Sequence, residues 1–325
     1  MRARDTATLS AQFAEIAAHP ARHVVISAEP LCELDEDSVR YLAGFCGAAT
    51  VTVGFVWRPL PDLIRAYWQE WVRHGSGEDF AAFLAGRLLD PGRDRLLNPS
   101  ATLEPFAAAF GREAIRILSY PDCLEAGGNL LDGLLAAGGL SAINPAPRVV
   151  HPSPPLAVSE VARALTLIAH THVPRPPGLP GCLVDAVAGA AETAVCAHAI
   201  ALAGTETRTF TLDQGVAPFG SLHAQFSATW RDRMDATRAF DAEAGRVARL
   251  TVPDPAWLLH PDAVPTLHQL FAALCGLPRA PDPAAKLARE VTELRAALTA
   301  MRRSASWRLT APLRRVAALR PGGDD

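Results

Sequence analysis

The sequence predicts an α/β fold in which a parallel sheet carries helices on both faces, with a helical C-terminal part. Three short apolar runs rich in β-branched residues predict strands at 23–29, 51–57 and 114–120. Stretches with helical periodicity separate these runs, and strands so short and apolar are typical of parallel sheets buried on both faces. The chain has 325 residues, 49% of them hydrophobic, and is therefore long enough to bury such a sheet.

The first expected strand lies between two helices. Residues 5–18 repeat apolar side chains at helical spacing, which predicts a helix with one apolar face. The run HVVISAE at 23–29 is interpreted as a buried strand that ends at Glu29. Asp35 stands where it can cap the following helix, whose apolar residues are Val39, Leu42 and Phe45.

The other two strands enclose several helical segments. The strand VTVGFVW at 51–57 leads directly into a helix over 62–74. Helical patterns around 80–89 and 101–111 then lead to the strand at 114–120. This order predicts parallel pairing, because two parallel strands need a long crossover between them.

After residue 140 the chain becomes rich in proline and its periodic segments are helical. The proline-dense stretches predict extended connections. Helices are expected at 156–170, 182–202, 219–245 and 262–275. We therefore divide the chain into an α/β core at 1–140, a mainly helical completion of the same domain at 141–281, and a tail at 282–325.

The tail combines a short coiled-coil seam with a basic amphipathic stretch. The seam alternates spacings of four and three residues and consists of Leu287, Val291, Leu294, Leu298 and Met301. It predicts a homo-oligomer or a partner helix bound through 287–301. Residues 302–320 contain six arginines and no acidic residue, which favours an anionic membrane surface as partner. A solvated tail is the alternative interpretation.

Composition excludes several classes of protein. The formal net charge of −3 gives no basic excess, so nucleic acid is not an expected partner. The six cysteines include no C-x-x-C pair, which excludes a zinc ribbon and a thioredoxin motif. The N-terminus lacks an apolar run of signal-peptide length and no apolar run of about 18 residues occurs, so we expect a cytoplasmic protein, at most peripheral to the inner face of the membrane.

Four segments within residues 23–170 follow one another as in the bacterial sulfotransferase family, including its polysaccharide-modifying members. They are VVISAEPL, VTVGFVWRPLPDLIRAYWQEWVRHG, AFGREAIRILSYPDCLEAGGNLLDGLLAAGGL and HPSPPLAVSEVARALTLI. In that family the first resembles a strand with a Ser-Ser-Glu-like turn, the second a strand–Arg–Pro–helix segment, and the third a Phe-Gly–strand–Tyr–helix segment. The resemblance implies a sulfotransferase-like core of the nucleoside-triphosphate-hydrolase type.

The resemblance also implies a cofactor and a pair of site residues. Family members take a sulfuryl group from 3′-phosphoadenosine 5′-phosphosulfate and transfer it to a hydroxyl or amine, here of a glycan acceptor. Glu29 would be the catalytic base and Arg58 would hold the 3′-phosphate. The residues alone leave other interpretations open: Glu29 as an exposed strand-end carboxylate, and Arg58 as a surface arginine paired with Asp62 or Glu70.

Two departures from the family pattern concern the nucleotide. No Gly-Thr-rich phosphosulfate loop and no G-x-x-x-x-G-K-[ST] motif is present, and the only lysine, Lys286, belongs to the tail. Ala66 stands where the family has a helical serine, and alanine cannot hydrogen-bond a phosphate. We therefore expect either a misplaced gene start or a degenerate member, and weak nucleotide binding by this chain.

Other candidate motifs favour ordinary packing. The aromatic cluster of Trp57, Tyr67, Trp68 and Trp71 has a spacing more typical of a core than of a sugar-stacking platform. His170 and His172 form an H-x-H pair for which the pattern signals no third ligand, so no metal site is predicted.

The sequence therefore leaves three functions open. The first is a sulfotransferase-like protein, truncated or degenerate, that acts on a cell-surface or extracellular polysaccharide precursor. The second is a non-catalytic scaffold or partner protein in capsule or O-antigen assembly. The third and weakest is a glycosyltransferase-associated domain, for which no D-x-D motif follows an expected strand.

Overall fold

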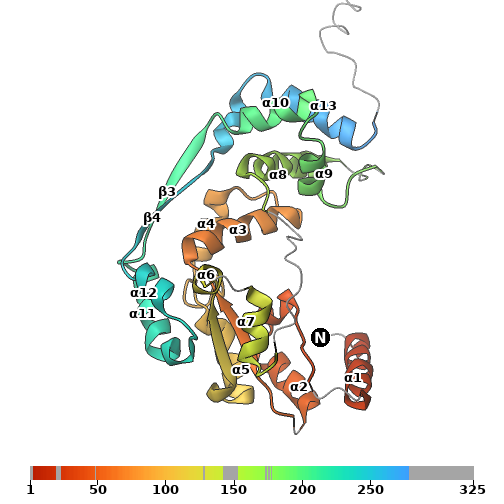
Figure 1. Ribbon diagram of the computed structural model, residues 1–325. Helices are drawn as coiled ribbons and strands as arrows, with labels where there is room; N and C mark the ends of the chain where they lie inside the picture. The colour runs from red at the N-terminus through yellow and green to blue at the C-terminus, as the bar shows by residue number, and fades with distance from the viewer. Residues whose placement is uncertain are drawn as a thin grey trace, which may run out of the picture.

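The computed structural model describes residues 3–19, 23–47, 49–126, 129–141, 153–172, 174, 176 and 178–277. This part of the chain is a mixed α/β structure with a small parallel sheet, an antiparallel ribbon that runs along the outer edge of the molecule, and many helices (Figure 1). The expected coiled-coil seam at 287–301, the basic stretch at 302–320 and Lys286 lie outside the described residues.

The first half of the chain contains the parallel sheet. Its elements are α1 (Ala3–Ala18), η1 (Glu29–Glu33), α2 (Glu36–Cys46), β1 (Val53–Trp57), α3 (Leu60–Arg73), α4 (Phe80–Leu88), α5 (Ser100–Phe110), η2 (Arg112–Ala114), β2 (Ile115–Ser119), α6 (Tyr120–Glu125) and α7 (Leu130–Ala137). The expected helices at 5–18, 62–74, 80–89 and 101–111 and the strands at 51–57 and 114–120 are confirmed, with small shifts at their ends.

The second half contains helices and the ribbon. Its elements are α8 (Leu156–Thr171), α9 (Leu183–Gly189), α10 (Ala194–Ala203), β3 (Thr207–Asp213), α11 (Phe219–Trp230), η3 (Arg231–Arg233), α12 (Arg238–Glu243), β4 (Val247–Pro253), η4 (Pro255–Leu259) and α13 (Ala263–Leu274).

Strands β1 and β2 pair in parallel, with Val53 opposite Ile115 and Trp57 opposite Ser119. Helix α7 covers one face so closely that a Cβ on Gly54 would lie 3.0 Å from Leu134 Cδ2. The other face packs against α5, α11 and α12 through their buried aromatic residues. The prediction of a parallel sheet with helices on both faces is confirmed for these two strands.

The expected strand at 23–29 is wrong. Residues 23–28 have no regular secondary structure, and Glu29 instead begins the 3₁₀ helix η1. The apolar side chains of Val24, Val25 and Ile26 are 47%, 62% and 50% exposed. The β-branched run is local, whereas a strand needs a partner to accept its hydrogen bonds, and no described strand pairs with these residues.

A second correction concerns the part after residue 140, where the sequence predicts only helices. Strands β3 and β4 pair antiparallel, from Thr207 opposite Pro253 to Asp213 opposite Val247, and form a long ribbon between α10 and α11 (Figure 1). The expected helix at 219–245 is divided into α11, η3 and α12. Met234 forms a parallel bridge with Ile117, so the chain leaves the helix there to lie along β2.

The other long helix expected in this part is also broken. The segment 182–202 forms α9 and α10, which are bent by 116° relative to one another. Thr193 accepts a hydrogen bond from the Cys196 amide at 3.4 Å and so begins a new helix. Within the described residues no single helix is both long and apolar enough to cross a membrane. The bent pair of α9 and α10 has that length and apolar composition only when the two helices are taken together.

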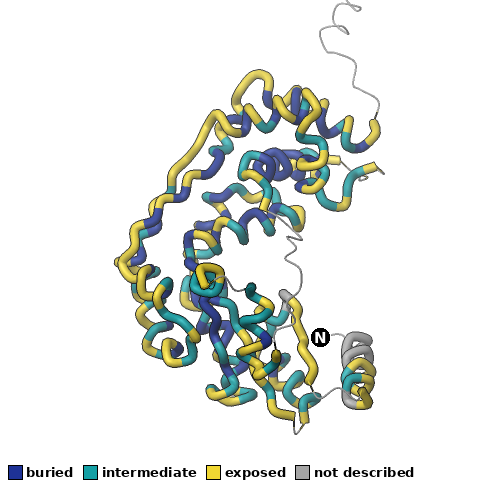
Figure 2. The backbone as a smooth tube through the Cα atoms, viewed as in Figure 1, coloured by how far each residue is buried: buried dark blue, intermediate teal, exposed yellow. Residues whose placement is uncertain are grey.

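The molecule has two hydrophobic cores, and each contains residues from before and after residue 140. The larger one joins α3, α4, α8, α10 and α13 to the ribbon and contains Trp68 and Trp257. The smaller one joins β1, β2, α2 and α5 to α11 and α12 and contains Trp57 and Trp230. Figure 2 shows much of α8 as buried, while much of the ribbon surface is exposed. Trp57 and Trp68 thus confirm core packing, whereas Trp71 is 38% exposed.

His223 of α11 gives this region a pH dependence that can be measured. Its ring stacks on Phe240 at 4.2 Å, and burial lowers its pKa from the ordinary value of 6.5, against the opposing effect of Glu243 and Asp241. Because the unfolded chain then binds a proton more readily, stability falls as the pH drops below 6.5 towards the folded pKa.

We expect the His223→Gln variant to lose the part of the pH dependence of stability that His223 causes. The measurement is the free energy of unfolding in urea between about pH 7.5 and about pH 5.5. His198→Gln, at an exposed position of α10, serves as the matched control for the substitution and should keep the wild-type pH dependence of stability. Equal slopes in wild type and His223→Gln would contradict the prediction.

Candidate functional site

The strongest candidate site lies at the carboxyl ends of the two parallel strands, where α/β sheets commonly bind ligands. Arg58 directly follows β1, and Pro59 then precedes α3. Trp57 on one side of Arg58 belongs to the smaller core, whereas Leu60 packs against the larger one. Arg58 therefore stands where the chain passes from one core to the other.

The guanidinium group of Arg58 lies over the ring of Tyr120, with Cζ 4.8 Å from the ring centroid. Its Nε is buried and has no hydrogen-bond partner within the described residues. The two carboxylates that could have paired with Arg58 have other partners: Asp62 pairs with Arg65 at 3.7 Å, and Glu70 pairs with Arg73 at 3.4 Å. Arg58 therefore lies at a strand end, as predicted, and forms no ion pair among the described residues.

Strand β2 and the helix α6 that follows it contribute three polar groups to the same end of the sheet. It ends at Ser119, which is 3% exposed, and Tyr120 and Asp122 occupy the first turn of α6. Ser119 Oγ makes no hydrogen bond of regular geometry among the described residues, yet it lies near enough to Asp122 to help lower its pKa. This end of the sheet thus holds two buried polar atoms, Arg58 Nε and Ser119 Oγ, without a regular hydrogen bond among the described residues.

Asp122 is held as a carboxylate by groups from a distant part of the chain. Burial acts to raise the pKa of Asp122, but the hydroxyl of Ser119, the amide of Ala239 and the guanidinium of Arg238 outweigh it, and the pKa lies below its ordinary value. No sequence pattern connects Asp122 with Arg238, because residues 219–245 are expected to form one helix. The only local signal was Pro121, which marks the end of the strand.

Glu29, the second predicted site residue, does not follow a strand. Its backbone begins η1 after an irregular segment, so the strand-end placement expected for it is wrong. The structure describes the backbone of Glu29 but not its side chain, and its role as a base stays a prediction.

The two histidines of the H-x-H pair do not meet at a metal site. His170 is exposed near the end of α8, and the ring of His172 stacks on Phe271 at 5.2 Å. Among the described residues, no group of three or more His, Cys, Asp or Glu side chains could hold a metal ion.

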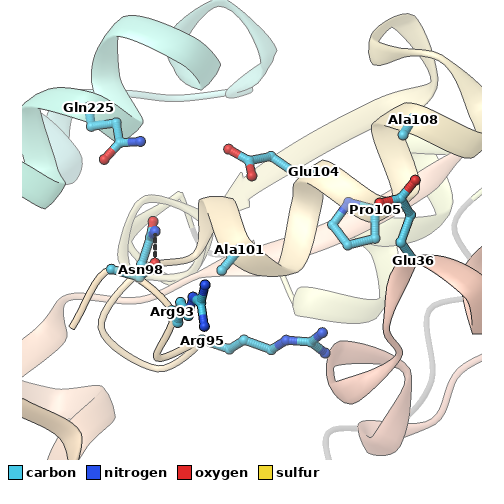
Figure 3. Close-up of a pocket in the computed structure, with 10 residues that line it drawn as sticks. Glu36, Arg93, Arg95, Asn98, Ala101, Glu104, Pro105, Ala108 and Gln225 are labelled. Atoms are coloured by element: carbon cyan, nitrogen blue, oxygen red, sulfur yellow. Dashed lines mark hydrogen bonds between the residues drawn. The ribbon is translucent and has the colours of Figure 1, made fainter. Parts of the chain in front are cut away.

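A groove of about 570 Å³ lies on the outer side of α5, between α2 and α11 (Figure 3). The small residues Ala101, Pro105 and Ala108 line it on α5, and charged and amide groups surround them. Arg95 there donates to Cys32 O at 2.7 Å, and Asn98 donates to Gly92 O at 2.6 Å. Because these groups are engaged within the protein, the groove is a weaker candidate than the strand ends.

The carboxyl ends of β1 and β2 lack the glycine-rich loop that a nucleotide phosphate commonly binds. Neither β1 nor β2 is followed by a glycine-rich loop, since β1 leads through Arg58 and Pro59 into α3 and β2 leads directly into α6. Ala66 lies within α3 and offers no side-chain donor. Comparisons of the chain with protein-family models, curated proteins and solved structures found no match, so the interpretation of this site depends on its own residues.

Proposed function

We propose that the chain is a sulfotransferase-like protein of polysaccharide modification, with an anion site at the carboxyl ends of β1 and β2. The observation that supports the proposal most directly is Arg58, whose Nε is buried without a partner among the described residues. An unsatisfied buried donor costs about 1–3 kcal/mol, so a bound acceptor would remove a penalty that the free protein carries. The planar guanidinium matches phosphate and sulfate oxygens in geometry and charge.

The cofactor of the proposed family, 3′-phosphoadenosine 5′-phosphosulfate, would supply the sulfuryl group. Arg58 is the residue proposed to hold its 3′-phosphate, and the described residues that follow β1 and β2 offer no cradle of backbone N–H groups for the phosphosulfate. The activity proposed for the described part of the chain is therefore anion binding at Arg58. For the sulfuryl transfer itself, Glu29 is the proposed base and a glycan is the proposed acceptor.

The alternative is a non-catalytic partner protein in capsule or O-antigen assembly. The exposed apolar run at Val24–Ile26 favours it, because solvent-exposed apolar residues in sequence are typical of interaction surfaces. Under either proposal we place the protein in the cytoplasm at the inner face of the membrane, with 287–301 and 302–320 as its association segments. A glycosyltransferase-associated domain is the weakest proposal, since no residue pattern favours it.

We expect Arg58→Ala to weaken binding of 3′-phosphoadenosine 5′-phosphate and of inorganic sulfate about 10- to 150-fold. This corresponds to the loss of about 1.5–3 kcal/mol for a hydrogen bond to a charged group. Isothermal titration calorimetry measures the change. The wild-type affinity for the nucleotide should itself be low, because only one phosphate meets a cation.

Arg65→Ala is the matched control, because Arg65 lies on the exposed side of α3 and pairs with Asp62. Its affinity for both ligands should equal that of the wild type. The proposal is overturned by a wild-type protein that binds neither ligand, or by binding that Arg58→Ala leaves unchanged.

A further inference from the structure

A carboxylate next to the Arg58 site holds the insertion between β3 and β4, residues 214–246, against the parallel sheet. We propose that Asp122 is a positioning residue that couples the order of this insertion to anion binding at Arg58. The inference rests on the proposed function, because it concerns the same site.

Asp122 caps a helix that belongs to a different part of the chain. Its side chain is 8% exposed and accepts hydrogen bonds from the Ala239 amide at 3.2 and 3.3 Å and from Arg238 Nε at 3.3 Å. Ala239 is in the first turn of α12, whose own N-cap residue, Thr237, makes no capping hydrogen bond. Asp122 therefore supplies the hydrogen-bond acceptor for a backbone N–H group in the first turn of α12, a role that the side chain of Thr237 does not fill.

Helix α6, which carries Asp122, also supports the anion site. Tyr120 and Asp122 lie in the first turn of α6, and the ring of Tyr120 lies under the Arg58 guanidinium. A shift of α6 that breaks the Asp122 contacts must also move the surface on which Arg58 rests. Arg238 reaches Glu125 at the other end of α6 as well, so the insertion holds both ends of this helix.

The insertion contacts both strands close to the site. Beside β2, Met234 forms its parallel bridge with Ile117, and the Asp235 amide donates to Ile117 O at 3.0 Å. Beside β1, the ring of Phe240 in α12 lies 5.2 Å from the ring of Trp57, the residue before Arg58. The insertion thus touches the chain just before Arg58 and just after Tyr120, as the neighbouring positions of α12 and α6 in Figure 1 illustrate.

These contacts imply reciprocal coupling. If ordering of the insertion favours the geometry that binds an anion, then a bound anion must favour the ordered insertion by the same free energy. Anion binding should therefore slow hydrogen exchange across 214–246, a region that contains no residue assigned to the anion itself.

The experiment measures hydrogen exchange of residues 214–246 in the full chain, with and without saturating inorganic sulfate or 3′-phosphoadenosine 5′-phosphate. We expect protection by the ligand in the wild type. Asp122→Ala should lose this protection and bind about tenfold more weakly, which is within the usual range of coupling between sites. Asp122→Glu, which keeps the charge, should recover part of both effects.

Asp241→Asn is the matched control, because the Asp241 carboxylate accepts hydrogen bonds from Arg231 within the insertion and, among the described residues, makes no hydrogen bond or ion pair with α6. Its affinity and its protection should match the wild type. If Asp122→Ala does not fold, the wild-type exchange measurement still decides, since it needs no variant.

Two outcomes separate this inference from the proposed function. Binding that depends on Arg58 but leaves exchange of the insertion unchanged overturns the coupling, and the anion site stands. Absence of any Arg58-dependent binding overturns both.

Discussion

Replacement of Arg163 by methionine should lower the free energy of unfolding by about 3–5 kcal/mol, because it leaves Glu160 buried without its counter-charge. Both residues are in α8 and almost fully buried, with side chains 4% and 1% exposed. Arg163 donates to the Glu160 carboxylate through Nε at 2.7 Å and Nη2 at 2.6 Å, and to Gly77 O through Nη1 at 3.0 Å. Methionine preserves much of the volume but none of these bonds.

The rest of this buried group explains why the loss cannot be repaired locally. Trp257 Nε1 already donates to Glu160 Oε1 at 2.9 Å, which satisfies one oxygen but supplies no charge. Gly77 O would lose the bond from Arg163 in the same variant. Because the Glu160 side chain is 1% exposed, solvent does not compensate for the lost counter-charge.

The control is Arg40→Met at an exposed pair with the same spacing of three residues. Arg40 pairs with Asp37 at 2.8 Å, with side chains 63% and 90% exposed. Solvent screens such pairs, so the change should stay below about 1 kcal/mol. Urea denaturation followed by circular dichroism measures both variants. Similar losses in the two would mean that burial does not set the strength of the Glu160–Arg163 pair.

Trp230→Ala should also cost about 3–5 kcal/mol, as large-to-small substitutions of buried aromatic residues do. Trp230 ends α11 and is 1% exposed in the smaller core. Its Nε1 donates to Ser100 Oγ at 3.1 Å, and Arg112 Cζ lies 5.7 Å from its ring centroid. The variant removes this packing and leaves a cavity between the insertion and α5.

Trp71→Ala is the control for the residue type, since Trp71 is 38% exposed and its Nε1 bonds to Glu78. Its cost should be below about 1 kcal/mol. Chemical denaturation with a single transition would further mean that the insertion unfolds together with the sheet. A small effect of Trp230→Ala would show instead that the insertion contributes little to the stability of the smaller core.

Local sequence signals predicted those elements that depend on neighbouring residues. Asp35 accepts from the Ser38 amide at 2.8 Å and begins α2, as the capping pattern predicts. The apolar strands β1 and β2 and the helices between them follow from periodicity and from the need for a crossover between parallel strands. The same reasoning placed Arg58 at the end of the sheet, directly after a buried strand, whereas its selection as a site residue came from the family resemblance.

Long-range pairing decided what the sequence predicted wrongly. The run at 23–29 has the composition of a buried strand, yet no described strand pairs with it. Thr207 and Pro253 pair across an insertion that contains three helical elements, and no local pattern specifies such a pair. The seven-residue strands of the ribbon are largely exposed on one face, so they lack the apolar character by which the other strands were recognised.

The sequence by itself therefore determined the strand–helix–strand framework and the position of Arg58, since both depend on residues close together in the chain. Only the tertiary structure placed Tyr120 under Arg58 and joined Asp122 to the start of α12, across 117 positions in the case of Ala239. The physical reason is that hydrogen bonds and ring contacts become favourable only after distant segments have been packed against the two cores, and short-range residue patterns carry little information about that packing.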